Sequence, residues 1–142
     1  MKNTLKIVAI ALIWVISFES CNKDNKDGLT RTDYLGTWPG YIDCGDPGNG
    51  NSKTLHITAG SGSNEIIFDL GPDDNLMAQV DGGNFTIPSQ FFSYNVGTVN
   101  EQTFTYTGTG TLVDGILTVS WTYVETDLYD SWTDNCVVTA NR

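Results

Sequence analysis

Residues 103–124 read TFTYTGTGTLVDGILTVSWTYV, two alternating stretches joined by Asp114-Gly115. On both sides every second residue is apolar or glycine, and mainly threonine or serine fills the positions between them. Period-two alternation around an Asp-Gly dipeptide is a strong signal for a β-hairpin. A two-residue loop there predicts four facing pairs: Leu112 and Leu117, Gly110 and Val119, Gly108 and Trp121, Tyr106 and Tyr123.

The sequence outside this hairpin predicts further strands. A second hairpin is expected at Gly82-Gly83, which joins an alternating strand that ends near Val80 to another that begins near Phe85. Four more strands are expected at 36–44, 53–58, 64–70 and 133–140. No segment has a sustained helical period. Eight short strands with regularly spaced turns predict an all-β domain, either a barrel or a sandwich. An immunoglobulin-type sandwich has a Trp soon after its first cysteine, but no Trp follows Cys44 until Trp121. We therefore expect an eight-stranded antiparallel up-and-down barrel, with a β-sandwich as the alternative.

The start of the chain has the pattern of an export signal. Lys2 and Lys6 precede an apolar run over residues 7–18, which is followed by Ser20 and Cys21. The run is about twelve residues, short of the roughly twenty that cross a bilayer. A basic start, a short apolar run and a small residue are typical of a secretory signal peptide, here residues 1–20.

The residues around Cys21 resemble the lipobox of bacterial lipoproteins, in which the cysteine receives a diacylglycerol and becomes the mature N-terminus. Ser20 fits this pattern, whereas Phe18 and Glu19 replace the usual leucine and small residue. The resemblance implies that acyl chains on Cys21, palmitate among them, hold the protein at a membrane. Cleavage without lipidation is the alternative, although no A-x-A-like site supports it. Lys23-Asp24 is similar to the export signals of surface lipoproteins, which favours the cell outer membrane and a surface-exposed position.

The mature chain is expected to consist of a tether and one acidic domain. Residues 21–33 are polar and without periodicity, which predicts a flexible tether after the lipidated cysteine. Residues 34–142 then form one β-barrel domain, long enough to fill a single core. Signal cleavage removes Lys2, Lys6 and Glu19, so that 7 basic and 17 acidic residues become 5 and 16. This negative charge argues against a nucleic-acid partner, and solubility is its simplest explanation.

Two cysteines remain when Cys21 is lipidated, and export brings them to an oxidising compartment. We therefore expect a disulfide between Cys44 and Cys136. It closes a loop of about 92 residues, for which the chain-entropy model gives a stabilisation of roughly 4 to 5 kcal/mol. The bridge joins the first expected strand to the last, and these are antiparallel neighbours in a closed barrel of this kind.

Gly36-Thr37-Trp38 resembles the G-x-W signature that opens the first strand of lipocalins and related calycin barrels. In those barrels the tryptophan plugs the closed end and packs under an arginine from near the end of the last strand. With Cys44 opposite Cys136, the antiparallel register places Trp38 opposite Arg142. The resemblance therefore implies a guanidinium over the indole, and a barrel whose other end can receive a ligand.

The sequence also predicts which end of the barrel carries the long loops. Tight turns fall at the Trp38 end, whereas loops at 45–52, 88–102 and 125–134 fall at the other end, where ligand contacts commonly lie. These rim loops contain aromatic and acidic residues: Phe91, Phe92, Tyr94, Tyr129 and Trp132, with Asp46, Asp127, Asp130 and Asp134. The candidate ligand-binding residues are the inward-phase side chains that lead to this rim: Phe104, Tyr106, Trp121, Tyr123 and Glu125. The same aromatics can instead fill the barrel, because eight strands enclose little space.

The sequence offers little support for catalysis or a metal. The one histidine, His56, shares the phase of solvent-facing threonines, and Asp73-Asp74 lies in an expected turn. Oxygens that suit calcium occur close together at Asp127, Asp130, Asp134 and Asn135. Their spacing fits no EF-hand loop, and a solvated acidic loop is favoured. We expect a protein that is not an enzyme, with no catalytic residues, no cofactor and no metal.

These observations predict a noncatalytic lipoprotein of the cell envelope whose lipocalin-like barrel binds a small apolar or aromatic ligand. A positive charge on that ligand would suit Glu125 and the acidic rim. The alternative is a structural or protein-interaction lipoprotein with a filled core, whose rim loops contact another envelope protein.

Overall fold

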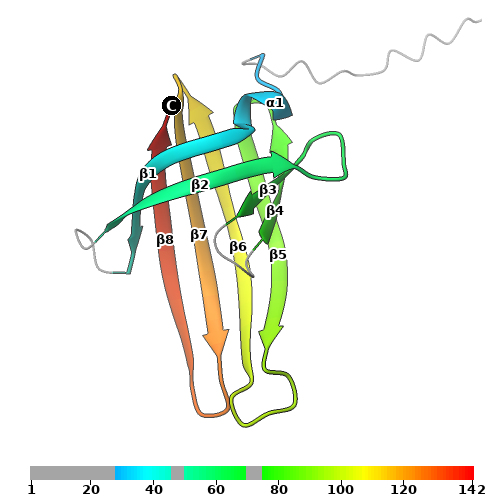
Figure 1. The fold of residues 1–142 in the computed structure, drawn as a ribbon, viewed down its shortest axis with the longest axis vertical. Helices are drawn as coiled ribbons and strands as arrows, with labels where there is room; N and C mark the ends of the chain where they lie inside the picture. Colours follow the sequence, from blue (N-terminus) through cyan, green and yellow to red (C-terminus); the bar gives the residue numbers. More distant parts are fainter. Residues whose placement is uncertain (1–27, 46–49, 70–74) are drawn as a thin grey trace, which may run out of the picture.

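The computed structural model describes residues 28–45, 50–69 and 75–142, which form a closed antiparallel barrel of eight strands (Figure 1). The elements are α1 (Arg31–Tyr34), β1 (Gly36–Cys44), β2 (Asn51–Ala59), β3 (Glu65–Asp69), β4 (Asn75–Asp81), β5 (Asn84–Tyr94), β6 (Gln102–Val113), β7 (Ile116–Thr126) and β8 (Ser131–Asn141). Each strand pairs with the next along the chain, and β8 pairs with β1. The predicted up-and-down barrel is confirmed, and the sandwich alternative is not adopted. The expected signal peptide at residues 1–20, Cys21, Asp46 and Asp73-Asp74 lie outside the described residues.

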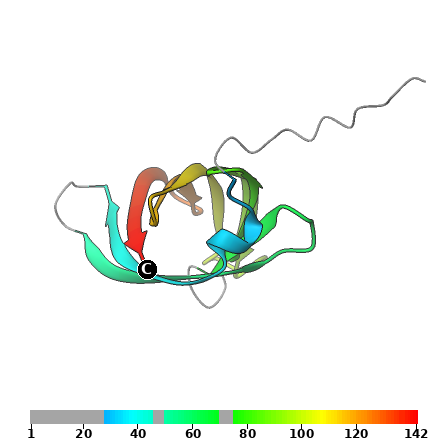
Figure 2. The same cartoon turned by 90° about the horizontal axis from the view of Figure 1, so that it is seen from above.

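Figure 2 shows the strands closing around the barrel axis, with α1 over one end. No helix in the described part of the chain is long and apolar enough to cross a membrane. The core is apolar, and buried side chains from all eight strands contribute to it. Within the described residues no polar or charged side chain is fully buried. The interior near the Trp38 end therefore contains buried apolar side chains from the surrounding strands.

The hairpin of residues 103–124 forms in the predicted register. Leu112 faces Leu117, Gly108 faces Trp121, and the other two predicted pairs also form. Asp114 and Gly115 both have positive φ, of 51° and 77°, as a two-residue turn of this kind requires. The glycines between the threonines have a packing role, because a methyl group at Gly110 would overlap the ring of Phe85 on β5.

The first and last strands also pair as predicted. Cys44 lies opposite Cys136, and the two form a disulfide with a Cα–Cα distance of 4.1 Å. Further along, the guanidinium carbon of Arg142 lies 4.2 Å from the centre of the Trp38 ring. Gly36 gives the arginine room, because a methyl group there would lie 3.2 Å from the Arg142 Nη2. The predicted arrangement of glycine, tryptophan and arginine is therefore confirmed.

A short helix that the sequence pattern did not indicate completes the closed end. Residues 31–33, assigned above to the tether, form α1 together with Tyr34, which is fully buried. The Tyr34 hydroxyl donates a hydrogen bond to the Gly82 carbonyl at 2.8 Å. The main-chain carbonyl of Tyr34 accepts one from the Trp38 indole N–H at 2.7 Å. The Tyr34 ring also meets Phe85 edge to face. A single turn is too short to leave a helical period in the sequence.

The strands are unequal, and β5 to β8 run well past the short β3 and β4 (Figure 1). β4 pairs with β5 from Asp81–Asn84 to Gln79–Thr86, after which β5 bulges between Ile87 and Gln90. There the Gln90 amide accepts from the Met77 N–H at 2.9 Å and donates to the Met77 carbonyl at 2.8 Å. One side chain thus takes the place of a strand partner where β5 leaves β4.

Beyond the bulge, β5, β6, β7 and β8 continue as a four-stranded sheet, which we call the projecting sheet. It consists of residues 90–94, 102–106, 122–126 and 131–135. The predicted rim loops are therefore too long. β5 continues to Tyr94 and β8 begins at Ser131, so Phe91, Phe92, Tyr94 and Trp132 lie on strands, and Tyr129 remains in a loop. Proline at 88 marks the bulge rather than the end of the strand, because a bulge tolerates a residue without an N–H.

Candidate ligand-binding site

The inward face of the projecting sheet carries six aromatic residues. One is Trp132 on β8, and we call the other five the aromatic shelf: Phe92, Tyr94, Phe104, Tyr106 and Tyr123. They share this face because they lie in the same phase of β5, β6 and β7. Tyr106 is buried and belongs to the core cluster, and the other four are half-buried. The shelf therefore extends the apolar interior of the barrel onto a partly exposed surface.

The rings of the shelf contact one another. Tyr106 is the centre: Phe92 meets it edge to face at 5.5 Å between centroids, Tyr123 lies tilted against it at 5.8 Å, and Phe104 is stacked at 6.3 Å. Tyr94 meets Phe104 edge to face at 5.4 Å. Each ring is held by at least one other, so the shelf needs little reorganisation to receive a ligand.

Of the five predicted binding residues, Trp121 belongs to a different part of the protein. It is 6% exposed and lies between Gly108 and Cys136 in one cross-strand row, inside the core. A methyl group at position 108 would lie only 2.8 Å from the Trp121 Cβ. Glycine at this position therefore allows β6 and β7 to pack closely beside the Trp121 side chain. Trp121 fills the barrel, as the filled-core alternative expected, whereas Phe104, Tyr106, Tyr123 and Glu125 lie together beyond it.

Glu125 lies at the edge of the shelf, opposite Phe104 on β6 and Trp132 on β8. Its Oε1 accepts a hydrogen bond from the Gln102 amide at 3.0 Å. Burial raises the pKa of Glu125, and the negative charges of Asp127 and Asp134 raise it further, while a hydrogen bond with Trp132 opposes them. An acid so close to the interior is less costly to bury when it has a hydrogen-bonding partner of this kind.

A second carboxylate touches the shelf from β8. The Tyr123 hydroxyl donates a hydrogen bond to the Asp134 Oδ2 at 2.9 Å. Burial raises the pKa of Tyr123, and the hydrogen bond and charge of Asp134 add to the effect. Tyr123 therefore stays protonated at neutral pH, and the charges of both Asp134 and Glu125 act on its hydroxyl group. A cation over the shelf would meet ring faces and carboxylates at once.

The acidic side chains of the last rim loop are engaged in local structure. Asp127 accepts hydrogen bonds from the main-chain N–H groups of Tyr129 and Asp130, at 2.7 and 2.8 Å. Asn135 accepts one from the Thr122 hydroxyl at 2.7 Å. Within the residues that the structure describes, no three His, Cys, Asp or Glu side chains gather as a metal site. The oxygens considered for calcium are thus spread over a turn and a strand.

His56 lies on the exposed face of β2, where its Nδ1 is 3.2 Å from the Thr37 hydroxyl oxygen. This matches the expectation of an ordinary surface residue. Phe92 and Tyr94 were expected in a rim loop and not among the binding residues, although Gln90, Phe92 and Tyr94 alternate along the chain. Pro88 obscured that signal, because proline argues against a continuous strand.

The chain matches no protein-family model, no curated protein and no solved structure. Its function is therefore inferred from the residues of the barrel.

Proposed function

We propose that this protein is a noncatalytic, lipid-anchored binding protein of the cell envelope, and that its aromatic shelf takes a small aromatic or apolar ligand with a positive charge. The observation that carries the proposal is the shelf itself: five aromatic rings in mutual contact, four of them half-buried, beside Glu125 and Asp134. The Gly36, Trp38 and Arg142 arrangement adds a likeness to lipocalins, which hold ligands at the end of the barrel opposite that tryptophan.

Charge and shape favour a cation over an anion. A cation placed over an aromatic ring gains about 0.5 to 2 kcal/mol, more as water is excluded. The two carboxylates add attraction, whereas an anion would be repelled by them and by the net charge of the chain, −10 at pH 7. An apolar or aromatic body on the ligand would cover the half-buried rings and remove apolar surface from water.

The proposed anchor agrees with the direction of the shelf. The described chain enters the barrel through α1 at the Trp38 end, and the projecting sheet extends from the opposite end (Figure 1). A lipid on Cys21 would thus attach the protein on the closed side. The shelf would then face away from the membrane, where a ligand arrives from solution.

A second candidate function is binding to another envelope protein. Its support is the tip of the projecting sheet, where the two loops expose Val96, Val99, Leu128 and Tyr129, each at least 66% exposed. Exposed apolar side chains gathered in adjacent loops are typical of a contact surface. The two candidate functions use different residues and are separable by mutation.

The test measures binding of three matched probes by NMR titration: phenethylammonium, 2-phenylethanol and phenylacetate. We expect the cation to bind most tightly and the anion least. Tyr123→Ala and Glu125→Gln should each weaken binding of the cation by about tenfold, which corresponds to about 1.4 kcal/mol.

Two control variants keep the shelf. Tyr129→Ala removes an aromatic ring from the tip, and Asp114→Asn removes a charge at the closed end, where asparagine tolerates the positive φ. Both should bind the cation as the parent does. If no probe binds, or if the shelf and control variants behave alike, the ligand-binding proposal is wrong. Loss of an envelope partner on Tyr129→Ala alone would then support the second function.

A further inference from the structure

The outer face of the barrel has a second, chemically different surface over β6, β7 and β8. Every outward position in the ranges Thr103–Val113, Ile116–Thr126 and Ser131–Asn141 carries Thr, Ser, Asn, Val or Ile. None is charged, in a chain with 17 acidic and 7 basic residues. The three strands pair without a register shift, so these side chains form regular cross-strand rows.

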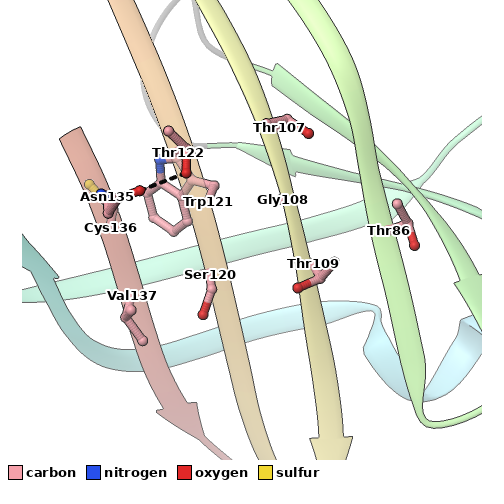
Figure 3. Close-up of a pocket in the computed structure, with 10 residues that line it drawn as sticks. All are labelled: Thr86, Thr107, Gly108, Thr109, Ser120, Trp121, Thr122, Asn135, Cys136 and Val137. Atoms are coloured by element: carbon pink, nitrogen blue, oxygen red, sulfur yellow. Dashed lines mark hydrogen bonds between the residues drawn. The ribbon is translucent and has the colours of Figure 1, made fainter. Parts of the chain in front are cut away.

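This face is hollowed at its centre into an open trough of about 430 Å³. Figure 3 shows the residues that line it, which come from four neighbouring strands. The hydroxyl groups belong to Thr86, Thr107, Thr109, Ser120 and Thr122. The trough lies at the row of Gly108, Trp121 and Cys136, where the sheet begins to leave the closed part of the barrel. Its volume is in the range of small-ligand sites, roughly 300 to 1,000 Å³.

The lining offers both donors and acceptors. The Thr122 hydroxyl donates to the Asn135 Oδ1 at 2.7 Å, which holds the amide in one orientation and leaves its NH₂ group to donate (Figure 3). The Thr107 hydroxyl donates to the Ile87 carbonyl at 3.5 Å and keeps its lone pairs as acceptors. Val137 and the threonine methyl groups add apolar surface between these polar groups.

These properties restrict the class of ligand. With no charged side chain in the lining, the trough has no ion pair to offer to a phosphate, a carboxylate or an ammonium group. Mixed hydroxyl and amide groups match a ligand that has many hydroxyl groups of its own. Methyl groups beside them match the C–H faces of a sugar ring. The trough is open, and the uncharged face continues along the strands, so it suits a segment of a chain better than a single enclosed molecule.

We propose that this outer trough binds a neutral saccharide chain. The site lies on the face of the sheet opposite the aromatic shelf and does not depend on the function proposed for the shelf. A lipoprotein at the cell surface would then contact glycans through one face and a small ligand through the other.

The test titrates the folded domain with four neutral oligosaccharides (maltohexaose, cellohexaose, laminarihexaose and mannohexaose) and with a charged one, hexagalacturonate. We expect at least one neutral oligosaccharide to bind at millimolar or lower concentration and to shift the amide signals of residues 107–109 and 120–122. Hexagalacturonate should bind more weakly.

The decisive variant is Thr109→Val combined with Thr122→Val, which removes two trough hydroxyls and keeps the β-branched shape. It should weaken saccharide binding by about tenfold. Its matched control, Thr111→Val combined with Thr139→Val, lies on the same face outside the trough and should bind within about twofold of the parent.

The proposal is overturned if no neutral oligosaccharide binds at millimolar concentration, if the charged one binds as tightly, or if both double variants lose binding equally. Tyr123→Ala separates the two sites. Saccharide binding that survives Tyr123→Ala supports the trough, and binding that is lost places the sugar on the shelf and disproves the trough. The amine probes test the shelf separately, so either proposal can fail while the other stands.

Discussion

The guanidinium of Arg142 stacks over the indole of Trp38, with 4.2 Å between the guanidinium carbon and the ring centre. The contact joins the end of the last strand to the start of the first, where the barrel closes. The same guanidinium donates a hydrogen bond to the Leu35 carbonyl. Arg142 therefore contacts both the Trp38 ring and the main chain between α1 and β1. Trp38 in turn hydrogen-bonds to Tyr34 in α1. One tryptophan therefore links α1, β1 and the C-terminal arginine.

Trp38→Ala should lower the free energy of unfolding by about 3 to 5 kcal/mol, because Trp38 is 2% exposed and its removal leaves a cavity at the closed end. Trp132→Ala is the control, since Trp132 is 39% exposed on the projecting sheet, and it should cost about 1 kcal/mol or less. Urea denaturation followed by circular dichroism measures both. Equal losses would show that Trp38 does not support the closed end.

Loss of the disulfide should lower the free energy of unfolding by roughly 4 to 5 kcal/mol, because the bridge closes a loop with a sequence separation of 92 in the unfolded chain. Cys44→Ala combined with Cys136→Ala, and the parent under reducing conditions, both test this by denaturant unfolding. The two should agree. A parent that unfolds at the same denaturant concentration with and without reductant would contradict the prediction.

Glu125→Gln should make the domain more stable at neutral pH, and this gain should disappear on acidification. The pKa of Glu125 is raised by burial above its ordinary value of 4.5, so the folded state holds the proton more tightly than the unfolded state. Stability therefore falls as the pH rises from about 4.5 through the raised pKa. Thermal unfolding at about pH 3.5 and at pH 7 tests this. A difference between variant and parent that is the same at both pH values would contradict it.

The N-terminal prediction concerns Cys21, which lies outside the described residues. Mass spectrometry of protein extracted from membranes should show a mature chain that begins at Cys21 and carries the added mass of its acyl chains. Cys21→Ser is the matched variant and should abolish both the lipid and the membrane fraction. A soluble mature form without added mass would overturn the anchor.

The barrel was largely predictable because its signals are local. Alternation of apolar and polar residues assigns each side chain to one face of a strand, and a two-residue turn such as Asp114-Gly115 sets the pairing of a whole hairpin. One further long-range constraint, the disulfide from Cys44 to Cys136, set the pairing of the first and last strands. The stacking of Arg142 on Trp38 then followed from counting residues along that register.

The strand order, these registers and the choice of inward-pointing side chains all follow from the sequence alone. Which of the inward side chains belong to the core and which to the surface depends on the folded arrangement of all the strands. Trp121 and Tyr123 share one phase of β7, yet Trp121 is buried within the barrel and Tyr123 lies half-buried on the projecting sheet. The difference depends on where the neighbouring strands end. β4 stops pairing with β5 at Gln79–Thr86, and β1 stops pairing with β8 at Cys44–Cys136. The residues of a strand determine which of its side chains point inward. Whether those side chains are buried depends on the length of the strands that pair with it or face it, which can be distant in the sequence.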